Sequence, residues 1–185
     1  MQVSYDADPM PTTADHETTG DHSPAGAFAR HHAPLLRYAA RLTGDPDRAQ
    51  DIVQDTFAKL LAQPPGRVDG HLAEWLFTVC RHRALDVLRK EGRMTSLDTL
   101  PADALPADSG PPPAAAAERA ETHEALLRLI GGLPPNQQEI VRLKFQNGFS
   151  YQEISRITAL SVSNVGFLLH TAVRRLRADF AAQQP

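Results

Sequence analysis

Polar side chains gather at the start of a C-terminal segment that has the periodicity of a helix. Ser163 and Asn164 open this segment, which runs to Arg177, and an Asn side chain can pair with adenine through two hydrogen bonds. A serine at a helix N-terminus can hold a phosphate together with backbone N–H groups. Arg174 and Arg175 lie near the end of the segment. The residue types therefore suit contact with DNA, although the arginines alone are equally consistent with a solvated helix end.

A helix-turn-helix is the element expected to position these side chains. Ser150 and Glu153 form a capping box before a short helix over residues 151–158. After a turn, Ser163 is expected to be the N-cap of the second helix, over residues 164–177. Ile154 and Val165 begin the apolar faces that would pack against each other.

Two residues of the second helix are unusual for that position. Gly166 lowers helix propensity by roughly 1 kcal/mol relative to Ala, which indicates a close approach by another group. Phe167 can meet a thymine methyl group or pack inside, and the sequence favours neither.

Several classes of protein are excluded by what the sequence lacks. Cys80 is the only cysteine, in an apolar helical stretch that indicates a buried thiol, and the eight histidines show no metal-ligand spacing. No glycine-rich phosphate loop, nucleophile elbow or convergent carboxylate pair occurs, so the sequence predicts no enzyme, metal or cofactor. No apolar run reaches the roughly 18 residues of a membrane span. The acidic N-terminus lacks the features of a secretory signal, so we expect a cytoplasmic protein.

The net charge of −3 is unevenly distributed along the chain. Residues 1–29 carry five acidic residues and no Lys or Arg, and residues 94–117 carry three acidic residues and no Lys or Arg. Two basic blocks remain, with eleven basic and eight acidic residues at 30–93, and eight basic and six acidic residues at 118–185. Because nucleic-acid binding depends on local positive charge, both blocks are suited to it.

The same division predicts the domain organisation. Residues 1–26 have the composition of a disordered acidic tail, and the Pro/Ala-rich residues 93–117 that of a stiff linker. Between and after them, helical periodicity and no alternating strand pattern predict an all-α protein with two small domains, at 27–92 and 118–182. The expected helices span residues 28–42, 46–63, 71–91, 118–130, 136–146, 151–158 and 164–177. Gly44, Asp45 and Pro46 supply a stop, an N-cap and a first helical residue.

Three segments carry a resemblance to a known family. The segments DIVQDTFAKLL (51–61) and AEWLFTVCRHRALDVLRKEGR (73–93) resemble the second conserved region of the extracytoplasmic-function sigma factors of bacterial RNA polymerase. The segment from Leu133 to Arg177, which contains the helix-turn-helix, resembles their fourth region. The three occur in the family's order and flank a variable linker. The resemblance implies a transcription-initiation subunit that binds core polymerase and recognises the −10 and −35 promoter elements.

For polymerase docking, the resemblance implies the polar face of the second helix. Its residues would contact the clamp coiled coil of the largest polymerase subunit: Asp51, Gln54 and Asp55. Relatives often carry a more acidic run here, whereas this chain has Arg48 and Gln50. One hypothesis is that phosphorylation of Thr56 by a regulatory kinase restores negative charge; the simpler alternative is that the two aspartates suffice.

For the −10 element, the resemblance implies capture of an unstacked base by the third helix. Cations suited to the strand are Arg81, His82, Arg83, Arg89, Lys90 and Arg93. His82 stands where many relatives carry a base-reading asparagine. Trp75 offers a ring for stacking, but its place in the apolar stripe favours a core position.

For the −35 element, the resemblance implies the second helix of the helix-turn-helix. Relatives commonly have Lys, Ser and Arg where this chain has Gly166, Phe167 and Leu168. The remaining candidates for DNA contact are Ser161, Ser163, Asn164, Phe167, His170, Arg174 and Arg175.

The expected partners are core RNA polymerase and promoter DNA, with an anti-sigma factor clamped between the two domains as a further expectation. The acidic tail is an alternative inhibitor that would cover the basic helices. A stand-alone helix-turn-helix regulator is the rival function. It would require a receiver or ligand domain at 27–92, which a purely helical block does not resemble.

Overall fold

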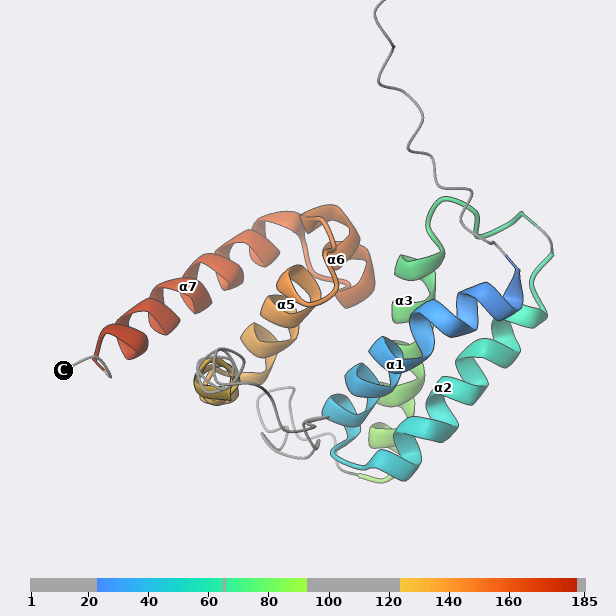
Figure 1. Ribbon diagram of the computed structural model, residues 1–185, viewed down its shortest axis with the longest axis horizontal. Helices are drawn as coiled ribbons and strands as arrows, with labels where there is room; N and C mark the ends of the chain where they lie inside the picture. The colour runs from blue at the N-terminus through green and yellow to red at the C-terminus, as the bar shows by residue number, and fades with distance from the viewer. Residues whose placement is uncertain (1–22, 65, 93–123, 183–185) are drawn as a thin grey trace, which may run out of the picture.

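The computed structural model describes residues 23–64, 66–92 and 124–182, and every regular element among these residues is a helix (Figure 1). The predicted all-α class is therefore confirmed for this part of the chain. Residues 1–22 of the predicted tail, the predicted linker at 93–117 and the start of the predicted helix 118–130 lie outside the described residues. The described part of that helix spans residues 124–131.

Helix α1 (Pro24–Thr43) begins a full turn earlier than predicted. The hydroxyl of Ser23 accepts a hydrogen bond from the N–H of Gly26 at 3.0 Å, and Pro24 occupies the first helical position. Residues 24–26 therefore belong to the helix and not to the predicted tail. At the other end Gly44 adopts a left-handed φ of 67°, which ends the helix as predicted.

Helices α2 (Pro46–Leu61) and α3 (Leu72–Lys90) complete an N-terminal bundle with α1. Asp45 caps α2, because its carboxylate accepts hydrogen bonds from the N–H groups of Asp47 and Arg48 at 3.0 and 3.2 Å. The three helices meet over buried apolar side chains that include Leu35, Ile52, Val53, Leu76, Phe77 and Cys80. Trp75 is partly buried against this core, as its place in the apolar stripe predicted.

Helices α5 (Pro135–Phe145), α6 (Tyr151–Thr158) and α7 (Val162–Ala181) form the C-terminal group. The predicted end of α5 is confirmed by Gly148, which has a φ of 76°, and by the N–H of Phe149, which donates to the Leu143 carbonyl at 3.2 Å. Ile140, Leu143, Ile154, Ile157 and Val165 form the centre of this group.

The two groups pack against each other through α3 and α6 and through α1 and α5. The Phe77 ring lies 5.0 Å from the Phe149 ring in an edge-to-face arrangement, and 5.1 Å from the Tyr38 ring. The buried apolar residues therefore form one cluster that is continuous between the groups. We call this packing the closed arrangement; Figure 1 shows the blue-to-green group beside the orange-to-red group.

Candidate polymerase and promoter interfaces

The helix-turn-helix consists of α6, a short turn and α7, and it is held by local hydrogen bonds. The predicted capping box is present: the Glu153 N–H donates to the Ser150 hydroxyl at 3.3 Å, and the Ser150 N–H donates to the Glu153 carboxylate at 2.7 Å. These hydrogen bonds lower the pKa of Glu153. In the turn, Ala159 takes a left-handed φ of 60°, and the Ser155 hydroxyl donates to the Leu160 carbonyl at 2.6 Å.

The recognition helix α7 begins two residues earlier than predicted. Ser161, not Ser163, is its N-cap, because the Ser161 hydroxyl accepts the hydrogen bond from the Asn164 N–H at 3.2 Å. The predicted Ser163 cap was therefore wrong. Ser163 and Asn164 lie inside the first turn with exposed side chains, where both point away from the core.

All the residues predicted to contact the −35 element are exposed on α7 or its cap. Phe167 is 67% exposed, so the alternative that it packs inside is wrong. The helix phase explains this outcome, because Val165, Leu169 and Ala172 fill the inward face. The outward face carries Ser161, Ser163, Asn164, Phe167, His170, Arg174 and Arg175.

Gly166 is not explained by a close approach of another group. A Cβ atom built at this position would lie 3.7 Å from the Cε2 atom of Tyr151, which is an ordinary van der Waals contact. The predicted tight approach was therefore wrong. Tyr151 is 40% exposed, and the Lys144 ammonium lies 5.5 Å from its ring centroid. These two side chains add a cation and a ring beside α7.

Arg81, predicted to contact the promoter strand, is buried in an ion pair with the other helical group. Its Nε donates to Oε1 of Glu139 at 2.8 Å, and the Tyr38 hydroxyl donates to the same oxygen at 2.6 Å. Arg81 is 7% and Glu139 8% exposed. Burial alone lowers the pKa of Arg81, but the charge of Glu139 outweighs it and the pKa is raised. Burial, followed by the Glu139 charge, raises the pKa of Tyr38, so the phenol stays protonated and Arg81 stays charged.

The other cations predicted for the −10 element lie along the C-terminal half of α3 and after it. His82, Arg89 and Lys90 are exposed, and Arg89 pairs with Asp86 at 2.9 Å. Arg83 is half-buried and donates from Nε to Asp55 on α2 at 2.8 Å. Arg93 lies outside the described residues.

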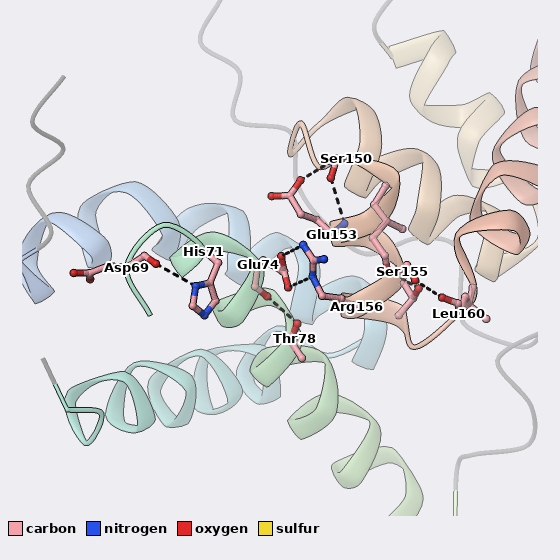
Figure 2. A network of polar contacts seen from close by, with 11 residues as sticks. Asp69, His71, Glu74, Thr78, Ser150, Glu153, Ser155, Arg156 and Leu160 are labelled. Carbon is pink, nitrogen blue, oxygen red and sulfur yellow. Dashed lines mark hydrogen bonds and ion pairs between the residues drawn. The ribbon is translucent and has the colours of Figure 1, made fainter. Parts of the chain in front are cut away.

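A second ion pair joins α3 to the helix-turn-helix. Arg156 on α6 donates from Nε and from a terminal nitrogen to the two oxygens of Glu74 at 2.6 and 2.7 Å (Figure 2). This is a bidentate pair, the geometry that an arginine favours with a carboxylate. Figure 2 also shows the capping box and the Ser155–Leu160 hydrogen bond on the same helix. The first helix of the helix-turn-helix therefore rests directly on α3.

The predicted polymerase face lies on the exposed side of α2. Asp51 and Gln54 are exposed, whereas Asp55 is half-buried and pairs with Arg83. Arg48, which weakens the negative charge of this region in the sequence, pairs with Asp45 at 3.0 Å and with Glu91. Its charge is therefore compensated by acidic groups at the start of α2 and the end of α3.

Burial makes the Thr56 hydroxyl inaccessible and the Cys80 thiol unreactive. The Thr56 side chain is fully buried and donates to the Ile52 carbonyl at 2.7 Å, so a kinase has no access to it and the hypothesis of Thr56 phosphorylation was wrong. Burial raises the pKa of Cys80 to about 12, which keeps the thiol protonated, as expected for a core residue.

Among the described residues, no three His, Cys, Asp or Glu side chains form a group that could hold a metal ion. No helix in this part of the chain combines the length and apolar character needed to cross a bilayer.

Sequence reasoning missed the residues that join the two groups: Tyr38, Glu74, Glu139 and Arg156. Arg81 and Glu139 are 58 residues apart and Tyr38 and Glu139 are 101 apart. No periodicity links residues at such separations. A signal did exist at Glu139, because a carboxylate on the apolar face of an amphipathic helix needs a partner.

Comparison with protein families now identifies the class. The chain matches the family model "Sigma-70 region 2" over residues 27–94 and the model "Sigma-70, region 4" over residues 123–176. The first match covers α1 to α3 and the second covers α5, α6 and most of α7. The protein is thus a sigma factor of the sigma-70 type, and the alternative of a stand-alone regulator is not favoured.

Individual relatives narrow the assignment. The extracytoplasmic-function sigma factor SigL of Mycobacterium tuberculosis is 31% identical over 155 residues, which cover 81% of this chain and 84% of the relative. RpoE of Cereibacter sphaeroides, of the same class, is 27% identical and covers 85% of this chain and 88% of its own length. The chain belongs to the extracytoplasmic-function sigma factors, which bind core RNA polymerase and direct initiation at promoters.

Solved structures share the fold. The sigma factor RpoE from Bartonella quintana, determined in complex with the anti-sigma factor NepR, matches with a TM-score of 0.59 and 23% identity over 85% of this chain and 96% of its own. CnrH in complex with the cytosolic domain of CnrY matches with a TM-score of 0.52 and 22% identity over 89% and 94%.

The open surroundings of Gly166 lead to a prediction about stability. Gly166→Ala should raise the free energy of unfolding by about 0.5–1 kcal/mol, because alanine favours the helix and the new methyl group meets no close contact. Urea unfolding measures this change. Gly148→Ala is the matched control: a methyl group there would meet no atom within 4 Å, but its φ of 76° strains an alanine, so it should destabilise by about 1 kcal/mol. A loss of stability in Gly166→Ala would contradict this account.

Proposed function

We propose that this sigma factor works through three separate surfaces: the exposed face of α2 for polymerase, the C-terminal half of α3 for the −10 element, and the start of α7 for the −35 element. One observation carries the proposal. The chain combines a polar face with few cations on α2, in the N-terminal group, with the exposed recognition helix α7 in the C-terminal group. We further propose that residues 27–92 and 118–182 act as two domains, within the cytoplasm, by binding and not by catalysis.

The polymerase surface is supported by charge and exposure. Asp51 and Gln54 lie one turn apart on the exposed side of α2, and Asp47 extends the acidic side by a further turn. The nearby cation Arg48 is already paired with Asp45 and Glu91. A face of this kind complements a basic partner surface and speeds encounter with it.

Reversal of one charge tests this surface. Asp51→Lys should weaken binding to core polymerase by about tenfold or more, because a cation then faces a basic partner. Fluorescence anisotropy of the labelled full chain measures the affinity. Asp69→Lys makes the same charge change in an exposed loop outside α2 and should bind as the parent does. Equal affinities for both variants would place the docking surface elsewhere.

Reading of the −35 element is supported by the first turn of α7. Asn164 presents an amide that can pair with adenine N6 and N7, and Phe167 presents an apolar ring suited to a thymine methyl group. The N–H groups of the same turn and Ser161 lie where a helix N-terminus favours phosphate. Arg174 and Arg175 lie farther along the helix and suit contact with the sugar–phosphate backbone.

Asn164→Ala should remove about 1–3 kcal/mol of discrimination at one adenine of the −35 element, because a bidentate contact is lost. Holoenzyme affinity for promoters substituted at each position measures this. Arg174→Ala provides the contrast: it should weaken all promoters similarly and lower the salt slope by about 1. If Asn164→Ala also weakens every sequence equally, the residue contacts phosphate and does not read a base.

Contact between the promoter strand and Arg81 requires the closed arrangement to open. Arg81 lies 7% exposed against Glu139, and α6 rests on α3 through Arg156 and Glu74. A promoter strand has no access to Arg81 in this state. We therefore propose that the free factor is closed and that core polymerase, by binding the two halves at separate places, separates them.

Removal of the Glu139 carboxylate should favour opening. In Glu139→Ala the Arg81 charge would remain buried without its partner, a situation that typically costs about 3–5 kcal/mol. We expect a larger radius of gyration by X-ray scattering and tighter binding of free factor to single-stranded −10 DNA. Glu124→Ala, which removes an exposed carboxylate 3.5 Å from Arg128, should change neither. An unchanged radius in a folded Glu139→Ala variant would contradict the proposed opening.

Regulation by an anti-sigma factor is part of the proposed function. The Bartonella quintana RpoE and the CnrH structures each contain an anti-sigma partner, NepR and the cytosolic domain of CnrY. By analogy, an inhibitor of this chain would bind both halves and keep them from polymerase. Its identity would follow from capture with the full-length factor followed by mass spectrometry.

A further inference from the structure

One ion pair connects the proposed polymerase surface to the proposed −10 surface. Nε of Arg83 on α3 donates to Oδ2 of Asp55 on α2 at 2.8 Å. The sequence predicted different partners for the two residues, polymerase for the carboxylate and the promoter strand for the guanidinium. Among the described residues, each is the only ion-pair partner of the other. The two proposed surfaces therefore share a contact in which each residue neutralises the other.

Both side chains can be reached by a binding partner. The Arg83 side chain is 36% exposed and the Asp55 side chain is 48% exposed. Asp55 lies one turn after Asp51 along α2, so it borders the exposed face proposed for polymerase. Arg83 lies seven residues before the exposed Lys90, which places the two cations on the same side of α3. The pair lies within the N-terminal group, so its exposure does not require the closed arrangement to open.

A partner that binds one member of this pair must displace the other member. A polymerase cation that approaches Asp55 competes with Arg83, and a strand phosphate that approaches Arg83 competes with Asp55. A partly exposed ion pair adds little net stability because solvent screens it, so its replacement by a new ion pair is favourable at low cost. A guanidinium also matches the oxygens of a phosphate in charge and in fork geometry.

We propose that Asp55 and Arg83 exchange partners when the sigma factor enters the holoenzyme. In the free factor the two side chains bind each other. In the holoenzyme a cation of polymerase binds Asp55, and Arg83 is released to bind a phosphate of the −10 strand. Asp55 thus acts on strand binding through Arg83, as a positioning residue. This partner exchange rests on the proposed polymerase and −10 surfaces, and it is independent of the proposed opening.

The partner exchange couples two binding events. If polymerase raises the affinity of the factor for the strand by some ratio, the strand raises its affinity for polymerase by the same ratio. The strength of a partly exposed ion pair limits this ratio to about two- to fivefold. Arg89 lacks this coupling, because its partner Asp86 lies on the same helix at 2.9 Å and outside α2.

Replacement of Arg83 should therefore tighten binding to polymerase. In Arg83→Gln the Asp55 carboxylate is available without competition, so we expect an affinity for core polymerase about two- to fivefold higher than that of the parent. Fluorescence anisotropy of the labelled full chain, at constant ionic strength, measures it. Arg89→Gln is the matched control, since it removes the same charge from a paired arginine on the same helix. It should weaken strand binding and leave the affinity for core polymerase unchanged.

Replacement of Asp55 tests the partner exchange from the other side. In Asp55→Asn the Arg83 guanidinium is already released, so the free factor should bind a single-stranded −10 oligonucleotide about two- to fivefold more tightly. The ratio of holoenzyme affinity to free-factor affinity for this oligonucleotide should fall by the same factor. Asp86→Asn removes the same charge beside Arg89, so it should raise both affinities together and leave their ratio unchanged.

The partner exchange is wrong if Arg83→Gln binds core polymerase no more tightly than the parent, or if Arg89→Gln tightens that binding equally. An unchanged affinity ratio in Asp55→Asn leads to the same conclusion, and it decides the matter should Arg83→Gln fail to fold. Failure of the polymerase surface itself gives a different result, because Asp51→Lys would then keep its affinity for core polymerase. If Asp51→Lys loses this affinity while Arg83→Gln and Arg89→Gln bind equally, the surface is correct and the exchange does not occur.

Discussion

The buried Glu139 carboxylate on α5 joins three helices at the centre of the molecule. It accepts hydrogen bonds from Tyr38 on α1 and from Arg81 on α3, while Phe77 and Phe149 meet beside it. Because an uncompensated charge in this position is unfavourable, the carboxylate, the guanidinium and the phenol must all be present together. This cluster fixes the relative placement of the two helical groups together with the Glu74–Arg156 pair and the apolar contacts around Phe77, and the access of DNA to Arg81 depends on that placement.

Local signals were sufficient to predict most of the helices, because a helix boundary is decided by residues a few positions apart. The capping box at Ser150 and the stop at Gly44 were read directly from the sequence and are present. The start of α7 failed for a local reason as well: Ser161 and Ser163 are both good N-caps, and the choice between them is made by the left-handed Ala159 and the Ser155–Leu160 hydrogen bond. Neither of these can be recognised from residue type alone.

Positions of side chains that depend on tertiary packing could not be predicted in the same way. Phe167 is exposed because Val165, Leu169 and Ala172 already fill the inward face of α7. The sequence alone left open whether Phe167 faces outward or packs inside, because the phase of the helix was not known. Arg81 was expected on a DNA surface because of its type and its family position. Its burial follows from a carboxylate 58 residues away, and sequence spacing contains no information about such a pair.

The polar contacts between the two helical groups define their geometry more than they add to the free energy of unfolding, and this affects how the closed arrangement can regulate the protein. A buried ion pair gains little net stability, since the cost of desolvating both charges offsets most of their attraction. The Glu74–Arg156 pair is partly exposed and screened by solvent. Under the proposed opening, a partner that prefers one state would control whether a promoter strand can reach Arg81, the one described −10 candidate that is buried in the closed arrangement.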